Sequence, residues 1–294
     1  MAVVVLLAAT SCSNESVNDV ENAVENVLVP VTVNVSDFSV SLENISEGTT
    51  RAADPATYDG VKSLTLAFYA GDGTEAFKTT QAKGALEEGE TFGEFTLRLP
   101  MGNYTMVVIG HGLNDGEPAV TLTSPTEATF GEYPARETFV VTQTVNITNT
   151  SAVDISATLN RIIAKLQVVS TDGRTANAAN VRMTMSAGSR DFNPTTGLAI
   201  TNGGFSNTVN ISAAAGSTSS SVSYLFLTTD EQTMDVTIET LDADGAVLFS
   251  KTVPDVPFKR NRVTKLTGAM YTNNSVSGAF QIETEWEDQY DGTF

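Results

Sequence analysis

Apolar and polar side chains alternate along many short segments of this chain, which is the pattern of β-strands that bury one face. The first such segment is residues 27–42, where the alternation shifts by one position midway. Its apolar positions are Val29, Val31, Val33, Val35, Phe38, Val40 and Leu42. We predict one or two strands here, with a buried face.

A second clean alternation occupies residues 280–287, close to the C-terminus. Phe280, Ile282, Thr284 and Trp286 lie on one side of this segment, and four polar residues lie on the other. The segment follows a polar linker beyond the last strand signal of the main body, so it has the form of a strand in excess of the fold. The alternative is that it is the last strand of its own domain.

Strand signals separated by turn residues recur between these two ends, and almost no segment shows the period of 3.6 that a helix needs. The predicted strands of the first half are 61–69, 76–80, 92–99, 104–109, 119–123 and 138–148. Those of the second half are the end of 155–169, then 181–186, 204–211, 221–228, 235–241 and 246–253. This pattern predicts an antiparallel all-β protein.

The chain of 294 residues is long enough for two domains. We predict an N-terminal domain over residues 52–156 and a C-terminal domain over 157–271, followed by a linker and terminal strand at 272–294. Residues 43–57 carry turn chemistry and little to bury, so we expect an exposed loop there. Residues 13–51 would comprise a polar tether and the first strand.

Cys12, the only cysteine, follows a short apolar run and small residues at positions 2–11. A bacterial lipoprotein signal ends in this manner, with the cysteine as the site of lipid attachment. We therefore predict residues 1–12 as such a signal, although no Lys or Arg precedes the apolar run. A free thiol in a disordered terminus is the alternative.

Charge and residue inventory exclude several classes of function. The chain has 35 acidic and 16 basic residues and no long basic run, so nucleic acid is not a predicted partner. His111 is the only histidine, which leaves no zinc site, no Cys-His pair and no serine triad with a recognisable nucleophile motif. We interpret His111 as a strand-end residue entering a turn, and we predict no enzyme, no metal site and no cofactor.

Arg51 is the only basic residue among the first 61, and it lies in the predicted loop. A trypsin-like protease therefore has one target there, and a cut after Arg51 would leave Ala52 as the new N-terminus. An ordinary loop arginine is the alternative. The cut would detach the first strand, and about four buried side chains at about 1.5–3 kcal/mol each rival a domain's whole stability of about 5–15 kcal/mol. A strand from another chain could fill that groove, and residues 280–286 have the required spacing.

Four motifs carry a family resemblance. They are Cys12 after its apolar run, the Thr-Thr-Arg51-Ala-Ala segment, Arg161-Ile-Ile-Ala-Lys165, and Lys259-Arg-Asn-Arg-Val-Thr-Lys-Leu-Thr-Gly268. Together they resemble the fimbrillin family, the subunits of type V pili of anaerobic Gram-negative bacteria, over nearly the whole chain. The resemblance implies two transthyretin-like antiparallel β-sandwich domains of Greek-key type in tandem. It also implies export as a lipoprotein, removal of the N-terminal strand at an arginine, and assembly by donor-strand exchange.

Carried over by position, Cys12 would be the lipidated residue, Arg51 the cleavage residue and residues 280–286 the donor strand. The motifs at Arg161 and Asn261 are expected to stabilise the fold. The expected partners are other pilin subunits, a trypsin-like processing protease and, before cleavage, the outer membrane through the lipid. The resulting location is the cell surface, in a pilus.

The expected function is that of a structural pilus subunit of the stalk, with a role in adhesion. A membrane-retained anchor subunit is the second interpretation. A monomeric surface lipoprotein that binds glycans is a third, which the position of the only tryptophan, Trp286, in the tail does not favour. The sequence leaves open the protease, the adhesion target, the domain that loses the strand, and whether the polymer contains sister subunits.

Overall fold

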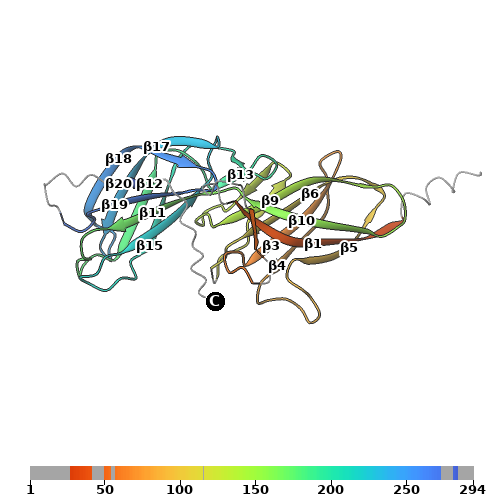
Figure 1. Ribbon diagram of the computed structural model, residues 1–294, viewed down its shortest axis with the longest axis horizontal. Helices are drawn as coiled ribbons and strands as arrows, with labels where there is room; N and C mark the ends of the chain where they lie inside the picture. The colour runs from red at the N-terminus through yellow and green to blue at the C-terminus, as the bar shows by residue number, and fades with distance from the viewer. Residues whose placement is uncertain (1–26, 42–49, 54–56, 115, 273–280, 284–294) are drawn as a thin grey trace, which may run out of the picture.

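The computed structural model describes residues 27–41, 50–53, 57–114, 116–272 and 281–283. Every regular element in these ranges is a β-strand, so the predicted all-β fold is confirmed. The strands form two bodies that lie end to end, with β13 at the junction (Figure 1). No helix in this part of the chain has the length and apolar character needed to cross a membrane.

The first body is built on one eight-stranded sheet, in the order β2-β1-β10-β9-β6-β3-β4, with β5 also paired to β1. Its strands are β1 (Leu28–Ser41), β2 (Thr50–Ala53), β3 (Ser63–Ala70), β4 (Glu75–Ala82), β5 (Glu94–Pro100), β6 (Gly102–His111), β9 (Thr138–Ile147) and β10 (Val153–Arg161). Alternate side chains of β5 and of β10 point into a single core, to which β1, β3, β6 and β9 also contribute. The sheet therefore curves around its own buried face.

Gln81 joins the two ends of this curved sheet. It is buried on β4, where its Nε2 donates to the Glu94 carbonyl at 2.8 Å and its Oε1 accepts from the Gly93 N–H at 2.9 Å. These bonds tie β4 to the start of β5, two strands that are not paired in the ladder order. A buried amide with both ends satisfied closes the core without leaving polar groups unpaired.

The second body contains two four-stranded sheets, in the orders β16-β11-β19-β20 and β15-β12-β17-β18. Their strands are β11 (Ala164–Ser170), β12 (Asn180–Met185), β15 (Phe205–Asn210), β16 (Ser220–Leu225), β17 (Glu231–Leu241), β18 (Val247–Lys259), β19 (Val263–Gly268) and β20 (Gln281–Glu283). Alternate residues of β11 and β12 are buried in one shared apolar core. The two sheets therefore face each other across that core.

A small sheet crosses the junction between the bodies, in the order β14-β13-β8-β7. Its strands are β7 (Thr121–Ser124), β8 (Glu127–Thr129), β13 (Asp191–Asn193) and β14 (Leu198–Ala199). Phe130 of the first body, with Phe192 and Phe226 of the second, forms a group of rings there; Phe192 and Phe226 stack at 4.3 Å between centroids. The bodies therefore share a third apolar core.

Two features of the sheets differ from the predictions. Two strand pairs, β1 with β10 and β11 with β19, are parallel, so the sheets are mixed rather than wholly antiparallel. Parallel pairing needs a long connection, and most of the first body lies between β1 and β10 in the chain. The loop predicted over residues 43–57 is wrong for residues 50–53, which form β2 against β1. Beyond the end of β5, β1 still offers unpaired backbone groups, and β2 satisfies them.

Candidate functional site

β1 lies inside the first sheet, with partners along both edges. On one side it runs parallel to β10 over residues 31–39. On the other it pairs antiparallel with β5 over residues 28–34 and with β2 over residues 38–41. The first described strand of the chain therefore occupies a central position in the sheet and not an edge.

The inward side chains of β1 are fully used in the first core. Val29, Val31, Val33 and Phe38 are completely buried, and Val35 is 6% exposed. Each such side chain contributes about 1.5–3 kcal/mol. Without β1, the facing edges of β5 and β10 would lose their partners and a groove would open into the core. The predicted buried face of residues 27–42 is therefore confirmed as far as Phe38.

Phe38 fills a pocket of its own at the far end of this groove. Its ring lies 5.1 Å from Phe139 and 5.8 Å from Tyr58, between centroids. Gly110 of β6 forms the floor, because a Cβ there would come within 3.2 Å of the Phe38 ring and 3.3 Å of Leu159. The absence of a side chain at Gly110 makes the space for Phe38.

A polar network extends from this pocket to the second body. The Tyr58 hydroxyl donates to Glu137 Oε1 at 2.8 Å, and the same oxygen pairs with Arg161 Nη2 at 2.7 Å. Burial, followed by the Glu137 carboxylate, raises the pKa of Tyr58, so this hydroxyl stays protonated and donates. Arg161 also lies 5.0 Å from the Phe139 ring and donates to Asn261 Oδ1 at 3.4 Å.

Arg161 and Asn261 come from two of the motifs that carried the family resemblance, one hundred residues apart in the chain. Asn261 has a left-handed backbone, with φ of 59°, at the turn between β18 and β19. Its N–H donates to the Ile163 carbonyl, which lies just after β10. The two motifs therefore meet at the point where the chain passes between the bodies, as expected of residues that stabilise the fold.

The predicted processing residues Arg51 and Ala52 lie in β2, where they pair with Val40 and Ser39 of β1. The side chains of β2 lie outside the described part of the structure. The segment is a short edge strand rather than the loop we predicted, and its four paired positions leave little ladder to open. Cleavage after Arg51 remains a prediction.

The other predicted site residues have mixed positions. Cys12, Phe280, Thr284 and Trp286 lie outside the described residues. Ile282 lies in β20, whose backbone pairs antiparallel with Lys265–Thr267 of β19. The three described residues of the tail thus form the last strand of their own sheet, which is the alternative that the sequence left open. The role of this segment as a donor strand remains a prediction.

Asp172 holds the residues from which the tail departs. Its carboxylate accepts hydrogen bonds from the N–H groups of Met270, Tyr271 and Thr272 at 2.8–2.9 Å, and from the Thr272 hydroxyl at 2.9 Å. Burial alone would raise the pKa of Asp172, but these hydrogen bonds outweigh it and hold the pKa below its usual range. The end of the second body is therefore fixed up to Thr272.

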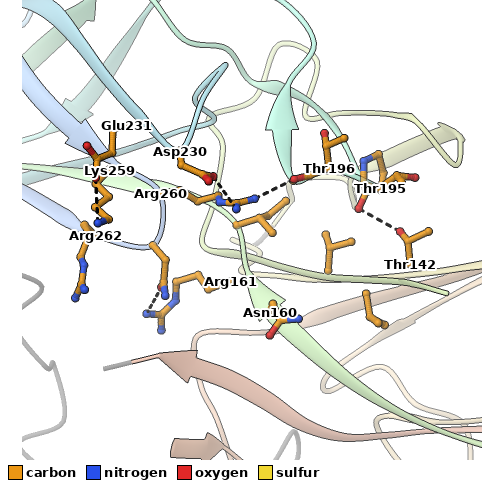
Figure 2. A pocket seen from close by; sticks show the side chains of 16 residues that line it. Thr142, Asn160, Arg161, Thr195, Thr196, Asp230, Glu231, Lys259, Arg260 and Arg262 are labelled. Carbon is orange, nitrogen blue, oxygen red and sulfur yellow. Dashed lines mark hydrogen bonds and ion pairs between the residues drawn. The ribbon is translucent and has the colours of Figure 1, made fainter. Parts of the chain in front are cut away.

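A cleft of about 710 Å³ lies at the junction between the bodies. Figure 2 shows Arg260 pointing between Asp230 and Thr196, with an ion pair of 2.7 Å to Asp230 and a hydrogen bond of 2.9 Å to the Thr196 carbonyl. Lys259 pairs with Glu231 at 3.0 Å on the adjacent wall. The Arg260 contacts fasten three turns together, and the Lys259–Glu231 pair joins neighbouring positions of β18 and β17.

The lining of this cleft is mainly polar. Its lining contains threonines, charged pairs and a few aliphatic groups, with no aromatic ring among the described residues that form it. Small-molecule sites are usually lined mainly by hydrophobic and aromatic side chains, with a few polar groups. Among the described residues, no group of three or more His, Cys, Asp or Glu side chains could hold a metal ion.

His111 lies away from the cleft, at the buried end of β6. The Val120 N–H donates to its Nε2 at 3.1 Å, so Nδ1 carries the proton and donates to the Gly112 carbonyl at 2.6 Å. Its ring meets Phe130 edge-on at 5.3 Å. The interpretation of His111 as a strand-end residue is confirmed, and both its nitrogens are occupied by backbone groups.

The structure is that of an all-β protein whose first described strand, β1, is buried between β5 and β10. A comparison with protein families shows the family to which the chain belongs. Residues 28–293 match a family described as a family of unknown function, DUF6562. The chain belongs to this family. No curated protein matches the chain.

Solved structures share the fold at low sequence identity. A putative adhesin from Bacteroides ovatus ATCC 8483 is 13% identical, with a TM-score of 0.50 over 85% of this chain and 88% of that chain. Another putative adhesin from Bacteroides ovatus is 14% identical, with a TM-score of 0.50 over 90% and 96%. The fimbrial anchor protein Mfa2 from Porphyromonas gingivalis is 13% identical, with a TM-score of 0.47 over 87% and 97%. The two structures with a TM-score of 0.50, both putative adhesins, show that this chain has the same overall fold.

Sequence reasoning missed the Phe38 pocket and the network that starts at Tyr58. Gly110 was the available signal, because a glycine inside the apolar run that begins at residue 106 indicates a close approach by another side chain. Tyr58 and Glu137 gave no signal, since each lies outside the strands and meets its partners only through the fold.

Replacing Arg161 with Leu should lower the free energy of unfolding by about 3–5 kcal/mol, because Glu137 would keep a buried charge without its partner. Urea unfolding measures this change. The control is Lys259→Leu, which breaks the Lys259–Glu231 pair, where the side chains are 48% and 70% exposed, and should cost about 1 kcal/mol or less. Equal losses in the two variants would contradict a structural role for the Arg161 network.

Burial lowers the pKa of His111 and outweighs the hydrogen bond to Gly112 and the Glu117 carboxylate, which both raise it. The unfolded chain, with a histidine pKa of about 6.5, therefore binds a proton before the folded chain does. The contribution of neutral His111 to stability should be complete above about pH 6.5 and fall as the pH drops through the folded pKa. Urea unfolding at a series of pH values checks this. His111→Gln should lose the part of the slope that begins below about pH 6.5, and an unchanged slope would refute the assignment.

Proposed function

We propose that this protein is a structural subunit of a pilus, which polymerises head to tail by donor-strand exchange after its N-terminal strand has been removed. The observation that carries the proposal is the position of β1, which is buried between β5 and β10 although it stands at the start of the described chain. Two proteins of the same fold are described as putative adhesins, which supports a role in adhesion at the cell surface.

The chain is exported as a lipoprotein through Cys12 and folds as two transthyretin-like sandwich domains in tandem. A trypsin-like protease then cuts after Arg51. The geometry supports separation after the cut. β2 is the last strand of the sheet and pairs with β1 at only four positions, so few hydrogen bonds have to break for β1 to leave. Once β1 dissociates, the lipid anchor leaves with it.

The open groove cannot persist in water, because it exposes the first core and two strand edges. The tail of a second copy, residues 280–286, fills it by adding a strand with inward side chains at alternate positions. Its present pairing on β19 covers three described residues, which is a small ladder to give up. Because the groove and the tail belong to different bodies, each contact is head to tail and the product is an open filament.

Blocking the cut tests the first step. Arg51→Ala should keep the chain membrane-bound with its N-terminal strand in place, whereas the wild type sheared from the cell surface should begin at Ala52 and run as high-mass assemblies. Intact mass and N-terminal sequencing of the sheared and membrane fractions measure this. Arg98→Ala, at an exposed position on β5, is the control and should be processed normally. A wild-type chain that keeps a lipidated Cys12 in every fraction would favour an anchor subunit or a plain surface lipoprotein.

Changing the tail tests the second step. The double variant Ile282→Asp with Trp286→Asp should be processed and folded but should remain monomeric, because a charge cannot enter an apolar groove unpaired. Size-exclusion chromatography and electron microscopy of the sheared fraction measure filament length. The control changes the polar side of the same segment, Gln281→Asp with Glu283→Asp, and should polymerise. Filaments of unchanged length in the first variant would rule out this donor assignment.

A further inference from the structure

The geometry points to Trp286 of a second copy as the side chain that occupies the Phe38 pocket, so that this pocket sets the register of the incoming strand. The inference rests on the proposed function and adds to it a specificity-determining pair of residues. The pocket is the one place along the described groove where β1 carries a large aromatic side chain; its other buried inward residues are valines.

The register of β1 against β10 shows what a replacement strand has to match. The inward side chains of β1 lie opposite β10 as Val31 and Val153, Val33 and Ile155, Val35 and Ala157, and Phe38 and Leu159. The last step spans three residues on β1 but two on β10, because a bulge lies between Val35 and Asp37. A strand without a bulge therefore fills the same four places with side chains at every second position.

The tail supplies this spacing. Running in the direction of β1 with Trp286 opposite Leu159, it places Thr284, Ile282 and Phe280 at the positions of Val35, Val33 and Val31. Moving the tail two residues one way brings Thr284 into the aromatic pocket and leaves most of it empty, which costs packing energy. Moving it two residues the other way brings the Asp288 carboxylate there, unpaired. One register therefore satisfies the pocket.

The pocket also has a reason to require an aromatic ring. Its walls are the rings of Tyr58 and Phe139, which contact each other edge-on at 5.7 Å, and Phe139 in turn faces Arg161. Tyr58 is half-buried, so the pocket has one wall at the surface that can adjust to a ring larger than that of Phe38. A ring in this place supports the Tyr58–Glu137–Arg161 network, and thereby the junction between the bodies.

The test uses the full chain with a specific protease sequence placed within residues 42–49. After cutting, the chain is unfolded in urea and refolded with an excess of a labelled peptide of residues 279–294. Native mass spectrometry then counts the molecules that carry the peptide in place of β1. A labelled peptide of residues 27–41 measures how well the groove is refilled by its own strand.

We expect the Trp286→Ala peptide to compete at least tenfold less well than the wild-type peptide, and Trp286→Phe to stay within about threefold of it, because the pocket already holds a phenylalanine. The control peptide, Glu287→Ala on the polar side, should match the wild type. In a Gly110→Ala chain, whose added Cβ narrows the pocket floor, the advantage of the wild-type peptide over the Trp286→Ala peptide should shrink several-fold.

The outcomes separate this inference from the proposed function. If the wild-type tail peptide binds but Trp286→Ala binds equally well, the register is wrong while donor-strand exchange stands. A loss confined to Phe280→Ala would mean that the strand runs in the opposite direction, which also overturns the inference. If the residue 27–41 peptide refills the groove and no tail peptide does, the tail is not the donor and both proposals fail.

Discussion

The burial of β1 between β5 and β10 is the interaction on which the first body depends. Its backbone completes the ladder on both sides, and its five inward side chains complete the core. Among the described strands none replaces either contribution, since β5 pairs with β1 alone. The strand is therefore integral to the fold, although in the chain it is separated from β3 only by β2 and the segments on either side of β2.

The same strand is tied to the second body through Phe38. Its ring packs on Tyr58 and Phe139, and the Tyr58–Glu137–Arg161 network continues to Asn261. The shared apolar core of Phe130, Phe192 and Phe226 joins the bodies at a second place. Occupancy of the groove and the stability of the junction are thus linked by direct contacts, through side chains that are largely buried.

The polar features of the molecule have structural explanations of their own. In the junction cleft, the Arg260–Asp230 pair fastens two turns together, and the Lys259–Glu231 pair links the neighbouring strands β18 and β17. Asp172 fixes the start of the tail, and His111 satisfies two backbone groups at the end of β6. The feature that distinguishes this protein is therefore apolar: it is the set of buried contacts along β1, not the polar cleft.

Alternation of side chains and turn chemistry are local properties, so the amino-acid sequence was enough to predict the strand content, the buried face of β1 and the strand-end position of His111. It did not reveal that β1 is central, that residues 50–53 form β2, or that two strand pairs are parallel. Those features depend on which distant edges are left free once the sheet has formed. Likewise, Gly110 was visible as a break in an apolar run, but its role emerged only in the folded chain. Phe38, Leu64 and Leu159 surround it there because residues so far apart in the chain meet only when the sheet curves.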